Sequence, residues 1–453
     1  MKELISEQRQ FFNSNATKPV DFRIQQLIKL KSVVRQYEPK LTEAVFKDFQ
    51  KGSFNTLVTE FSTVYDEVDH AISKVRKWSR NKRVSTNLAN LPGASYVIPE
   101  PLGVCLIIGA WNYPINLNLA PTIAAIAAGN TVVLKPSELA AHTSSVLKEM
   151  IARNFDPRVL TVVEGSVEET TELLAQSFDK IFFTGSVSVG KIVYQAAAKN
   201  LTPVTLELGG KSPLIVAADA NLKICVKRLV WGKYVNAGQT CVAPDYVLVD
   251  KSIEETFLAE LKKEIELSQF SLEKQNYAQI INERHFDRLI RLIDPKKVYT
   301  GGGFDRSKRW IAPTVLANVS ASDACMEDEI FGPILPVLNY EKLDDAISFV
   351  KSRPKPLALY LFSESNNIQR KVLEEISFGG GAVNDVVVHL GNKSLPFGGV
   401  GNSGTGSYHG EAGFLAFSHQ KSVIRRPTWF EPSLKYYPYT SWKLSMIKKV
   451  LGI

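Results

Sequence analysis

Cysteine is scarce in this sequence, and long apolar runs are absent. The 453 residues contain four cysteines, Cys105, Cys225, Cys241 and Cys325, with no Cys-x-x-Cys pair and no cluster of cysteine with histidine. A disulfide framework and a zinc site are therefore not indicated. Because no apolar stretch is long enough for a signal peptide or approaches the ~20 residues of a membrane span, we expect a soluble protein of a reducing, cytoplasmic compartment.

Charge of neither sign is concentrated in one segment. The chain has 54 Lys and Arg against 46 Asp and Glu, a formal net charge of +8, and its densest basic group is residues 74–83. A diffuse positive charge favours anionic ligands such as nucleotides, but the sequence contains no nucleic-acid-binding module. We interpret residues 74–83 as the solvated end of a helix and expect no nucleic acid partner.

The apolar residues follow two different periodicities. Residues 20–80 repeat them every three or four positions, which predicts a helical lead-in. From residue 93, short segments that are apolar throughout alternate with helical segments, and a second such run starts near residue 213. Strands of this kind are typical of parallel sheets covered on both faces. We therefore predict an α/β fold with two doubly wound parallel lobes and an additional arm, with ligands at the carboxyl ends of the strands.

One glycine-rich segment resembles a phosphate-binding loop. Gly185 to Lys191 follows an apolar strand and opens a helix, but Ile192 stands where a magnesium-binding loop needs Ser or Thr. What remains is a helix N-terminus that offers N–H groups and the Ser186 hydroxyl to an anion. We favour a dinucleotide pyrophosphate there over an ordinary strand-to-helix turn.

The formal Gly-x-Gly-x-x-Gly of residues 399–404 is a weaker signal. It follows Leu395-Pro396-Phe397 instead of a strand, and Gly406, Gly410 and Gly413 argue against a following helix. We interpret it as a shaped loop without a dinucleotide-binding role.

Two polar residues stand at strand ends. Asn112 follows the apolar strand of residues 103–110, where its amide would donate to an oxyanion, although a cap of the next helix explains it equally well. Glu207 lies in an apolar strand just before Gly209-Gly210. Burial would raise the pKa of its carboxyl toward the range of a general base. The alternative is a structural glutamate that bridges backbone groups.

Cys241 lies in a connecting turn between a helix that ends near residue 236 and a strand, whereas Cys105 and Cys225 lie in apolar runs as ordinary core residues. Nothing in the local sequence lowers the pKa of its thiol, so a buried filler is the alternative for an isolated cysteine. Together, a thiol, an amide donor, a carboxylate and an anion-binding helix are the set that acyl-level chemistry with a nicotinamide needs.

Seven segments in order resemble the motifs of the aldehyde dehydrogenase superfamily, and of its class 3 or fatty-aldehyde branch in particular. They span about residues 98–425 and read "PEPLGVCLIIGAWNYP", "VLKPSE", "FTGSVSVGK", "LELGGKSP", "NAGQTCVAPDY", "DEIFGPILPV" and "LPFGGVGNSGTGSYHG". The resemblance implies NAD(P)+-dependent oxidation of aldehydes, of medium or long aliphatic chain or aromatic, to carboxylic acids. It makes Cys241 the nucleophile that forms a thiohemiacetal and then a thioester, Asn112 an oxyanion donor and Glu207 the base for water.

The resemblance also implies the cofactor contacts, with no metal required. They are Lys135 and Glu138 at the adenosine ribose, Gly185, Ser186 and Gly190 at the pyrophosphate, and Glu329, Phe331 and Trp111 at the nicotinamide side. Tyr113 and Trp231 are candidates for the aldehyde tunnel, with packing aromatics as the alternative. Glu138 would bind a ribose diol and repel a 2′-phosphate, yet class 3 relatives accept both cofactors, so NAD and NADP both stay open.

A domain layout and a homodimer follow from the same resemblance. Residues 1–80 and 101–207 would form the NAD(P)-binding domain and 208–394 the catalytic domain. Residues 81–100 and 395–453 would form the bridging arm and C-terminal tail. In that tail Leu444, Ile447 and Leu451 form one helical stripe that is too short to span a bilayer. We expect the stripe to pack on the protein body instead of on a membrane surface.

Three other functions stay open from the sequence. An acylating enzyme would let a thiol such as coenzyme A resolve the thioester, but Glu207 argues for water. A nucleotide-triphosphate switch would use the loop at Gly185, but Ile192 argues against it. A binding protein on the same scaffold would not need Cys241, Glu207 and Asn112 together.

Overall fold

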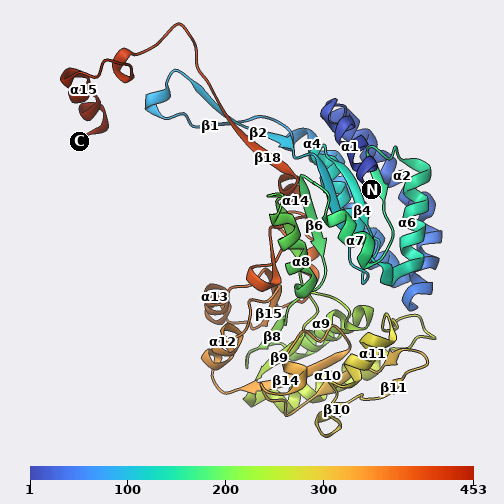
Figure 1. Cartoon of the computed structure of the whole chain (residues 1–453). Coiled ribbons are helices and arrows are strands. Elements are labelled where there is room, and N and C mark those ends of the chain that lie inside the picture. Colours follow the sequence, from blue (N-terminus) through green and yellow to red (C-terminus); the bar gives the residue numbers. More distant parts are fainter.

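The chain builds two α/β lobes and an arm that projects from the first lobe (Figure 1). The structure is a computed structural model that describes all 453 residues. A six-stranded sheet forms the centre of the first lobe, a seven-stranded sheet that of the second, and a three-stranded sheet the arm. The predicted α/β class with two parallel-sheet lobes is confirmed.

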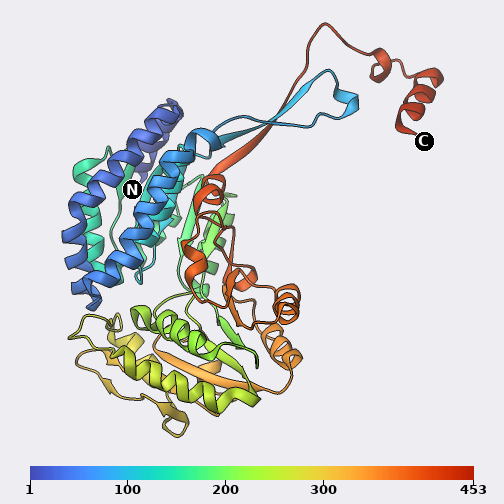
Figure 2. The ribbon, with the colours of Figure 1, turned by 180° about the vertical axis from the view of Figure 1, so that it is seen from behind.

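Helices form the first layer of the fold, as the periodicity of residues 20–80 predicts. They lie together along one side of the first lobe, as the blue ribbons of Figure 2 show, and α2 and α4 pack on α5. The helices of this layer are α1 (Lys2–Asn13), α2 (Val20–Phe49), α3 (Ser53–Thr56), the single π-helical turn η1 (Leu57–Phe61) and α4 (Ser62–Trp78).

The first sheet has the order β17-β7-β6-β3-β4-β5 and is parallel except for β17. Successive strand residues face opposite layers: Cys105 and Ile107 join the apolar cluster under α2, α4, α5 and α6, while Val104 and Leu106 join the cluster under α7 and α8. Both faces are therefore covered, which explains why these strands are apolar throughout. The elements are β3 (Val104–Ile108), α5 (Asn116–Ala128), β4 (Thr131–Lys135), the turn η3 (Glu138–Ala140), α6 (Ala141–Asn154), β5 (Leu160–Val162), α7 (Val167–Leu174), β6 (Lys180–Thr184), α8 (Val187–Ala198), β7 (Val204–Glu207) and β17 (Gly404–Thr405).

The second sheet has the order β10-β13-β14-β9-β8-β15-β16, with β10 antiparallel to its neighbour and all other pairs parallel. The elements of the second lobe are β8 (Pro213–Val216), α9 (Leu222–Tyr234), β9 (Tyr246–Asp250), α10 (Glu254–Ser268), α11 (Glu283–Ile290), β10 (Val298–Thr300), the separate hairpin β11 (Phe304–Asp305) and β12 (Trp310–Ile311), β13 (Thr314–Leu316), β14 (Ile334–Tyr340), α12 (Leu343–Lys351), β15 (Ala358–Phe362), α13 (Asn366–Glu375) and β16 (Gly380–Val383).

The segment after residue 395 returns to the first lobe before it enters the arm. β17 pairs with β7, and α14 (Gly410–Ala416) packs on α4 and α5. The expectation that no helix follows the loop of residues 399–404 is therefore wrong. Gly413 permits the close approach, because a Cβ there would lie 3.0 Å from the Cβ of Ala124, and the N–H of Gly410 donates to the Glu67 carboxylate at 3.3 Å.

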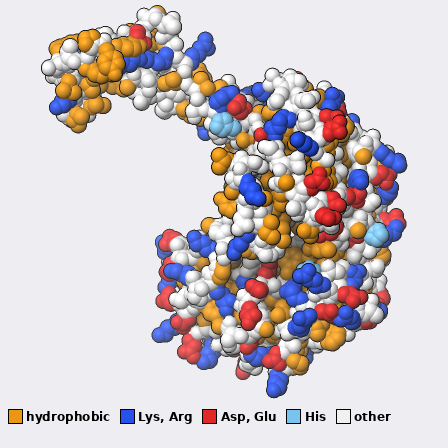
Figure 3. All heavy atoms as spheres, viewed as in Figure 1, with side chains coloured by type: hydrophobic (Ala, Val, Ile, Leu, Met, Phe, Trp, Pro, Cys, Tyr) orange, Lys and Arg blue, Asp and Glu red, His pale blue; other side chains and the backbone are white.

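The arm consists of β1 (Lys82–Val84), β2 (Ala94–Pro101) and β18 (Ser418–Arg425) in the order β1-β2-β18, all antiparallel. β18 leads the chain outward, so α15 (Ser441–Leu451) ends far from both lobes (Figure 1). No residue of α15 is buried, and Figure 3 shows hydrophobic side chains gathered on this end of the molecule. The expectation that the tail packs on the protein body is wrong, because the strand direction carries it away. None of the helices combines the length and hydrophobicity needed to cross a membrane.

Candidate active site

A left-handed turn presents Cys241 between α9 and β9. Asn236, Ala237 and Gly238 have φ values of 55°, 53° and 72°, and a Cβ on Gly238 would lie 2.3 Å from the carbonyl oxygen of Gly332. Glycine is therefore required at this position. Cys241 is partly exposed, whereas the other three cysteines are buried, as expected for Cys105 and Cys225.

Gln239 fastens this turn to the second lobe. Its Nε2 donates to the carbonyl oxygens of Asn236 at 3.1 Å and Gln279 at 2.9 Å, and its Oε1 accepts the N–H of Ile281 at 3.0 Å. All polar atoms of the amide are thereby used for positioning. The sequence showed Gln239 only as a polar residue of a motif, because its partners lie about 40 residues further along the chain.

Asn112 joins the same turn from the first lobe. Its side-chain Nδ2 donates to the backbone carbonyl oxygen of Gln239 at 3.0 Å, and the backbone carbonyl oxygen of Asn112 accepts from Nδ2 of Asn236 at 3.0 Å. The alternative of a helix cap does not hold, since α5 has Ile115 at its N-cap and the helix receives no side-chain cap from the loop. The structure therefore places the amide beside the turn that carries Cys241.

The electrostatic surroundings keep the Cys241 thiol protonated. Burial and the nearby carboxylates of Glu329 and Glu207 raise the pKa of Cys241 to about 12, while the N–H groups of Cys241 and Val242 act in the opposite direction. The fold brings a thiol and two carboxylates together but does not by itself ionise the thiol.

Glu207 ends β7 and is 3% exposed. Neither carboxylate oxygen has a hydrogen-bond partner among the protein groups, and burial raises the pKa of Glu207 well above its usual value. A glutamate that bridges backbone groups is therefore excluded. An unpartnered buried carboxyl costs free energy, which is a reason to assign it a chemical role.

Glu329 and Phe331 come from the segment before β14 in the second lobe. The N–H of Gly210 donates to the Glu329 carboxylate, and burial together with Asp245 raises the pKa of Glu329 to about 8. A Cβ on Gly209 would lie 1.9 Å from Oε2 of Glu329, so the carboxylate lies directly against the backbone that follows Glu207.

Trp111 contacts two aromatic side chains, Phe331 and His285. The Phe331 ring meets that of Trp111 edge to face, with 5.4 Å between the ring centres, and the centre of the His285 ring lies 5.7 Å from that of Trp111. Trp111 and Phe331 were predicted together at the nicotinamide side. His285 was not found from the sequence, because a single histidine in an amphipathic helix carries no chemical signal.

The N-terminus of α8 has the features that a pyrophosphate needs. Ser186 caps the helix, and its Oγ accepts the N–H of Val189 at 3.4 Å. Gly190 allows α8 to approach the sheet, because a Cβ there would lie 2.6 Å from a methyl group of Leu208. The N–H groups of the first helical turn are therefore offered at the carboxyl end of β6 beside Gly185.

Lys135 and Glu138 lie at the carboxyl end of β4, which β3 separates from β6 in the same sheet. Nζ of Lys135 lies 3.6 Å from Oε2 of Glu138 and donates to the carbonyl oxygen of Pro136 at 2.8 Å. Burial lowers the pKa of Lys135, while the Glu138 side chain is 47% exposed. The residues present at α8 and β4 thus fit a dinucleotide laid across the carboxyl ends of the first sheet.

The two tunnel candidates lie in different settings. The Tyr113 hydroxyl lies 2.6 Å from Oγ1 of Thr240, directly before Cys241. Trp231 is 46% exposed on α9, beside Lys227 and Arg228 in an open apolar hollow. Its place in the tunnel stays a prediction.

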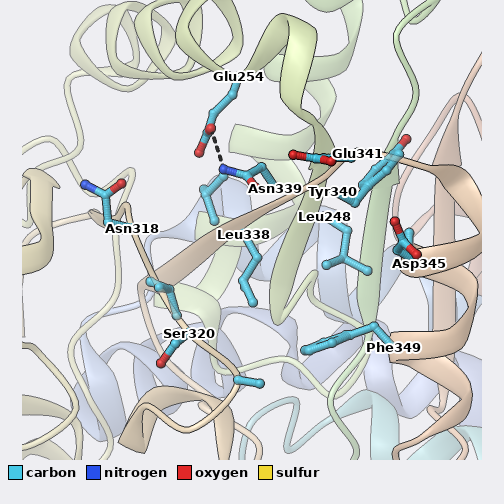
Figure 4. A pocket seen from close by; sticks show the side chains of 14 residues that line it. Leu248, Glu254, Asn318, Ser320, Leu338, Asn339, Tyr340, Glu341, Asp345 and Phe349 are labelled. Atoms are coloured by element: carbon cyan, nitrogen blue, oxygen red, sulfur yellow. Dashed lines mark hydrogen bonds between the residues drawn. The ribbon is translucent and has the colours of Figure 1, made fainter.

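Figure 4 shows a separate hollow of about 340 Å³ in the second lobe. Leu248, Leu338 and Phe349 line it, and the Asn339 amide donates to Glu254 at 2.7 Å across its rim. It contains none of the candidate residues, and we assign it no role. No group of three or more His, Cys, Asp or Glu side chains is arranged to hold a metal ion.

Comparison with known proteins identifies the family of this chain. The family model described as "Aldehyde dehydrogenase family" matches residues 1–423. The chain belongs to this family. It is accordingly an enzyme of the NAD(P)-dependent oxidoreductases that act on aldehydes, as the motifs predict.

Relatives of this aldehyde dehydrogenase cover nearly its whole length. The 4,4'-diaponeurosporen-aldehyde dehydrogenase of Staphylococcus aureus is 45% identical over 437 residues, 96% of this chain and 95% of the relative. The dimeric NADP-preferring aldehyde dehydrogenase of Mus musculus is 45% identical over 428 residues, 94% of each chain. Aldehyde dehydrogenase family 3 member A2 of Pongo abelii is 44% identical over 440 residues, 96% of this chain and 91% of the relative.

The solved structures agree. The substrate-bound AldH of Staphylococcus aureus superimposes with a TM-score of 0.96 at 44% identity and 99% coverage of both chains. The expected family, its class 3 branch and the fold class are confirmed.

Proposed function

We propose that this aldehyde dehydrogenase oxidises aldehydes of medium or long aliphatic chain, or aromatic aldehydes, to carboxylic acids through a covalent bond to Cys241. The observation that carries the proposal is the convergence of Cys241, Asn112, Glu207 and Glu329 on one left-handed turn at the junction of the two lobes. These residues come from four separate segments of the chain.

The chemistry of the covalent step follows from the contacts of Cys241. Its sulfur forms a bond to the aldehyde carbon, and the thiol proton passes to the Glu207 carboxylate and from there to solvent. The carbonyl oxygen gains negative charge and accepts hydrogen bonds from the Asn112 amide and the N–H of Cys241, each such donor contributing about 3 kcal/mol to catalysis. Bound NAD(P)+ supplies the hydride acceptor. The acyl group is then a thioester on Cys241.

Glu207 is assigned to the release of the product. A water molecule adds to the thioester carbon, Glu207 takes its proton, and the carbon–sulfur bond breaks to give the carboxylic acid and the Cys241 thiolate, which takes the proton from Glu207. Its raised pKa suits this task, because a more basic carboxylate takes a proton from water more readily.

The cofactor would be held by residues at the carboxyl ends of the strands of the first sheet and by Glu329 of the second lobe. Ser186 and the first turn of α8 would bind the pyrophosphate, Lys135 and Glu138 the adenosine ribose, and Glu329 the nicotinamide ribose. One relative is named NADP-preferring, while Glu138 opposes a 2′-phosphate, so we propose that the enzyme accepts both NAD and NADP.

We also propose a homodimer formed through the arm and the tail. Beyond residue 426, twelve large hydrophobic side chains are exposed, among them Trp429, Trp442 and Leu451. Exposed apolar surface of this extent marks an interaction site. A relative 45% identical is named dimeric, which supports a second copy as the partner.

The experiment is an aldehyde panel of increasing chain length, including 4,4'-diaponeurosporen-aldehyde, with NAD+ and NADP+ in turn. Cys241→Ala is expected to abolish NAD(P)H formation, whereas Glu207→Gln is expected to retain a single burst and lose steady turnover by about a hundredfold or more. Activity of Cys241→Ala would refute the covalent route. Acceleration of Glu207→Gln, or of the wild type, by added coenzyme A would instead indicate acyl transfer.

A further inference from the structure

A buried ion pair lies behind the active site in the N-terminal helical layer. Lys51 and Glu60 are 1% and 0% exposed, and Nζ of Lys51 lies 3.2 Å from Oε1 of Glu60. Burial raises the pKa of Glu60 and lowers that of Lys51, and each partner counteracts the shift of the other. A buried ion pair stabilises a fold no more than apolar residues of the same volume. Stability alone therefore does not explain the Lys51–Glu60 pair, and its other contacts must be considered.

The second oxygen of Glu60 holds the start of α5. Oε2 accepts the N–H of Ile115 at 3.0 Å and the N–H of Asn116 at 2.9 Å. These are N–H groups that the first turn of a helix leaves without an internal partner, and no residue of the loop itself caps them. Glu60 lies in the π-helical turn η1, a local irregularity that directs its carboxylate to this point.

Lys51 holds the other side of the same loop. Its Nζ lies 4.3 Å from the centre of the Tyr113 ring, a cation–π contact, and the Tyr113 hydroxyl meets Oγ1 of Thr240 at 2.6 Å. Between the two anchor points, at Tyr113 and at Ile115, the loop has little freedom. Asn112 directly precedes Tyr113, and its Nδ2 donates to the carbonyl oxygen of Gln239 at 3.0 Å.

We propose that Lys51 and Glu60 are positioning residues that hold the loop of residues 111–115, and with it the amide of Asn112, against the turn that carries Cys241. The inference rests on the proposed function, since it assigns these residues a task in the same reaction. Both side chains are buried and contact the loop from the helical layer, so they act through Asn112 and Tyr113. The Lys51–Glu60 pair thus keeps the Asn112 amide aligned with the Cys241 thiol, which the other lobe contributes.

The test compares Lys51→Met, Glu60→Gln and the double variant with a matched control, Asp179→Asn. Asp179 also pairs with a cation, Arg9 at 2.8 Å, and accepts a backbone N–H, that of Val104 at 2.7 Å, but at the opposite end of β3. For each protein the Tm, the kcat per titrated active site, and the KM for aldehyde and cofactor are measured.

Each single variant is expected to lower kcat about tenfold to a hundredfold, because a misplacement of ~1 Å costs about that much, while the KM for the cofactor changes less than about twofold. Asp179→Asn is expected to lower the Tm and leave kcat per active site unchanged. The double variant leaves no unpaired buried charge, so its Tm should recover toward that of the wild type while kcat stays low.

Recovery of kcat together with the Tm in the double variant would overturn the proposal, since the pair would then act through stability alone. So would single variants that fold and keep the wild-type kcat. If the wild type forms no NAD(P)H from any aldehyde, the proposed function fails instead. In that case the rate at which iodoacetamide alkylates Cys241 decides: a change of at least about threefold in the single variants, absent in Asp179→Asn, supports the positioning role, and an unchanged rate overturns it.

Discussion

The protonation state of Cys241 offers the sharpest test of the site. A thiol with a pKa of about 12 exists as thiolate at pH 9 only to about one part in a thousand. Because the thiolate is the species that iodoacetamide alkylates, the rate of the free enzyme should rise with pH from 7 to 10 without a plateau. The rise should be about tenfold per pH unit above pH 9 and less steep near pH 8, where ionisation of Glu329 raises the pKa of the thiol further.

The perturbation is Glu329→Gln, which removes one of the two carboxylates that raise the pKa of Cys241. One charge a few ångströms away in a partly screened site is worth about 1 to 2 kcal/mol, and 1.36 kcal/mol is a tenfold change in the thiolate fraction. We therefore expect Glu329→Gln to accelerate alkylation about tenfold at pH 9.

The size of the acceleration depends on pH in a way that identifies the charge of Glu329 as the cause. Its own pKa is raised to about 8, so it carries its full charge at pH 9 and is mostly protonated at pH 6.5. The acceleration should accordingly vanish at pH 6.5. Glu341→Gln, an exposed carboxylate paired with Lys251, is the matched control and should change nothing at either pH.

The assay is mass spectrometry of the alkylated protein, with Cys241→Ala as a blank because the other three cysteines are buried. A plateau of the free enzyme near pH 6 to 7 would show a thiolate already stabilised by the fold and would refute the reasoning. An equal acceleration at both pH values would refute the assignment to the charge of Glu329.

Two further predictions concern the cofactor and the assembly. Glu138→Gln removes a half-exposed carboxylate that lies 3.6 Å from Nζ of Lys135, and it should raise kcat/KM for NADP+ relative to NAD+ about fivefold in steady-state kinetics. An unchanged ratio would show that Glu138 does not lie at the ribose site. Deletion of residues 427–453 exposes no new core and should convert the proposed dimer to monomer in analytical ultracentrifugation, with the Tm of the lobes nearly unchanged. A dimer that persists would show that the tail does not form the contact.

The sequence predicts best where the determinant is local. Strands such as β3, β4 and β6 are apolar throughout because both faces of the sheet are covered, and that requirement is visible in any five consecutive residues. The turn before Cys241 and the helix N-terminus after Gly185 are likewise visible, because glycine at a sharp turn and serine at an N-cap act over a few residues.

Predictions failed where a distant segment decides. α14 forms although it contains two glycines, because Glu67 in α4 receives its first N–H and α5 offers a surface that only a glycine can approach. The direction of the tail depends on β18 pairing along β2, more than 300 residues earlier in the sequence, which apolar stripes in the tail do not reveal.

For the active site, the sequence by itself determined which chemical groups are available: a thiol, an amide, two carboxylates and an anion-binding helix end. Only the tertiary structure decided that they meet, that Asn112 contacts the Cys241 turn instead of capping a helix, and that Lys51 and Glu60 stand behind it. The physical reason is that pKa values, hydrogen-bond partners and burial depend on atoms within a few ångströms, and at this site the contacts of Asn112 with Asn236 and Gln239 join residues more than 120 positions apart in the chain.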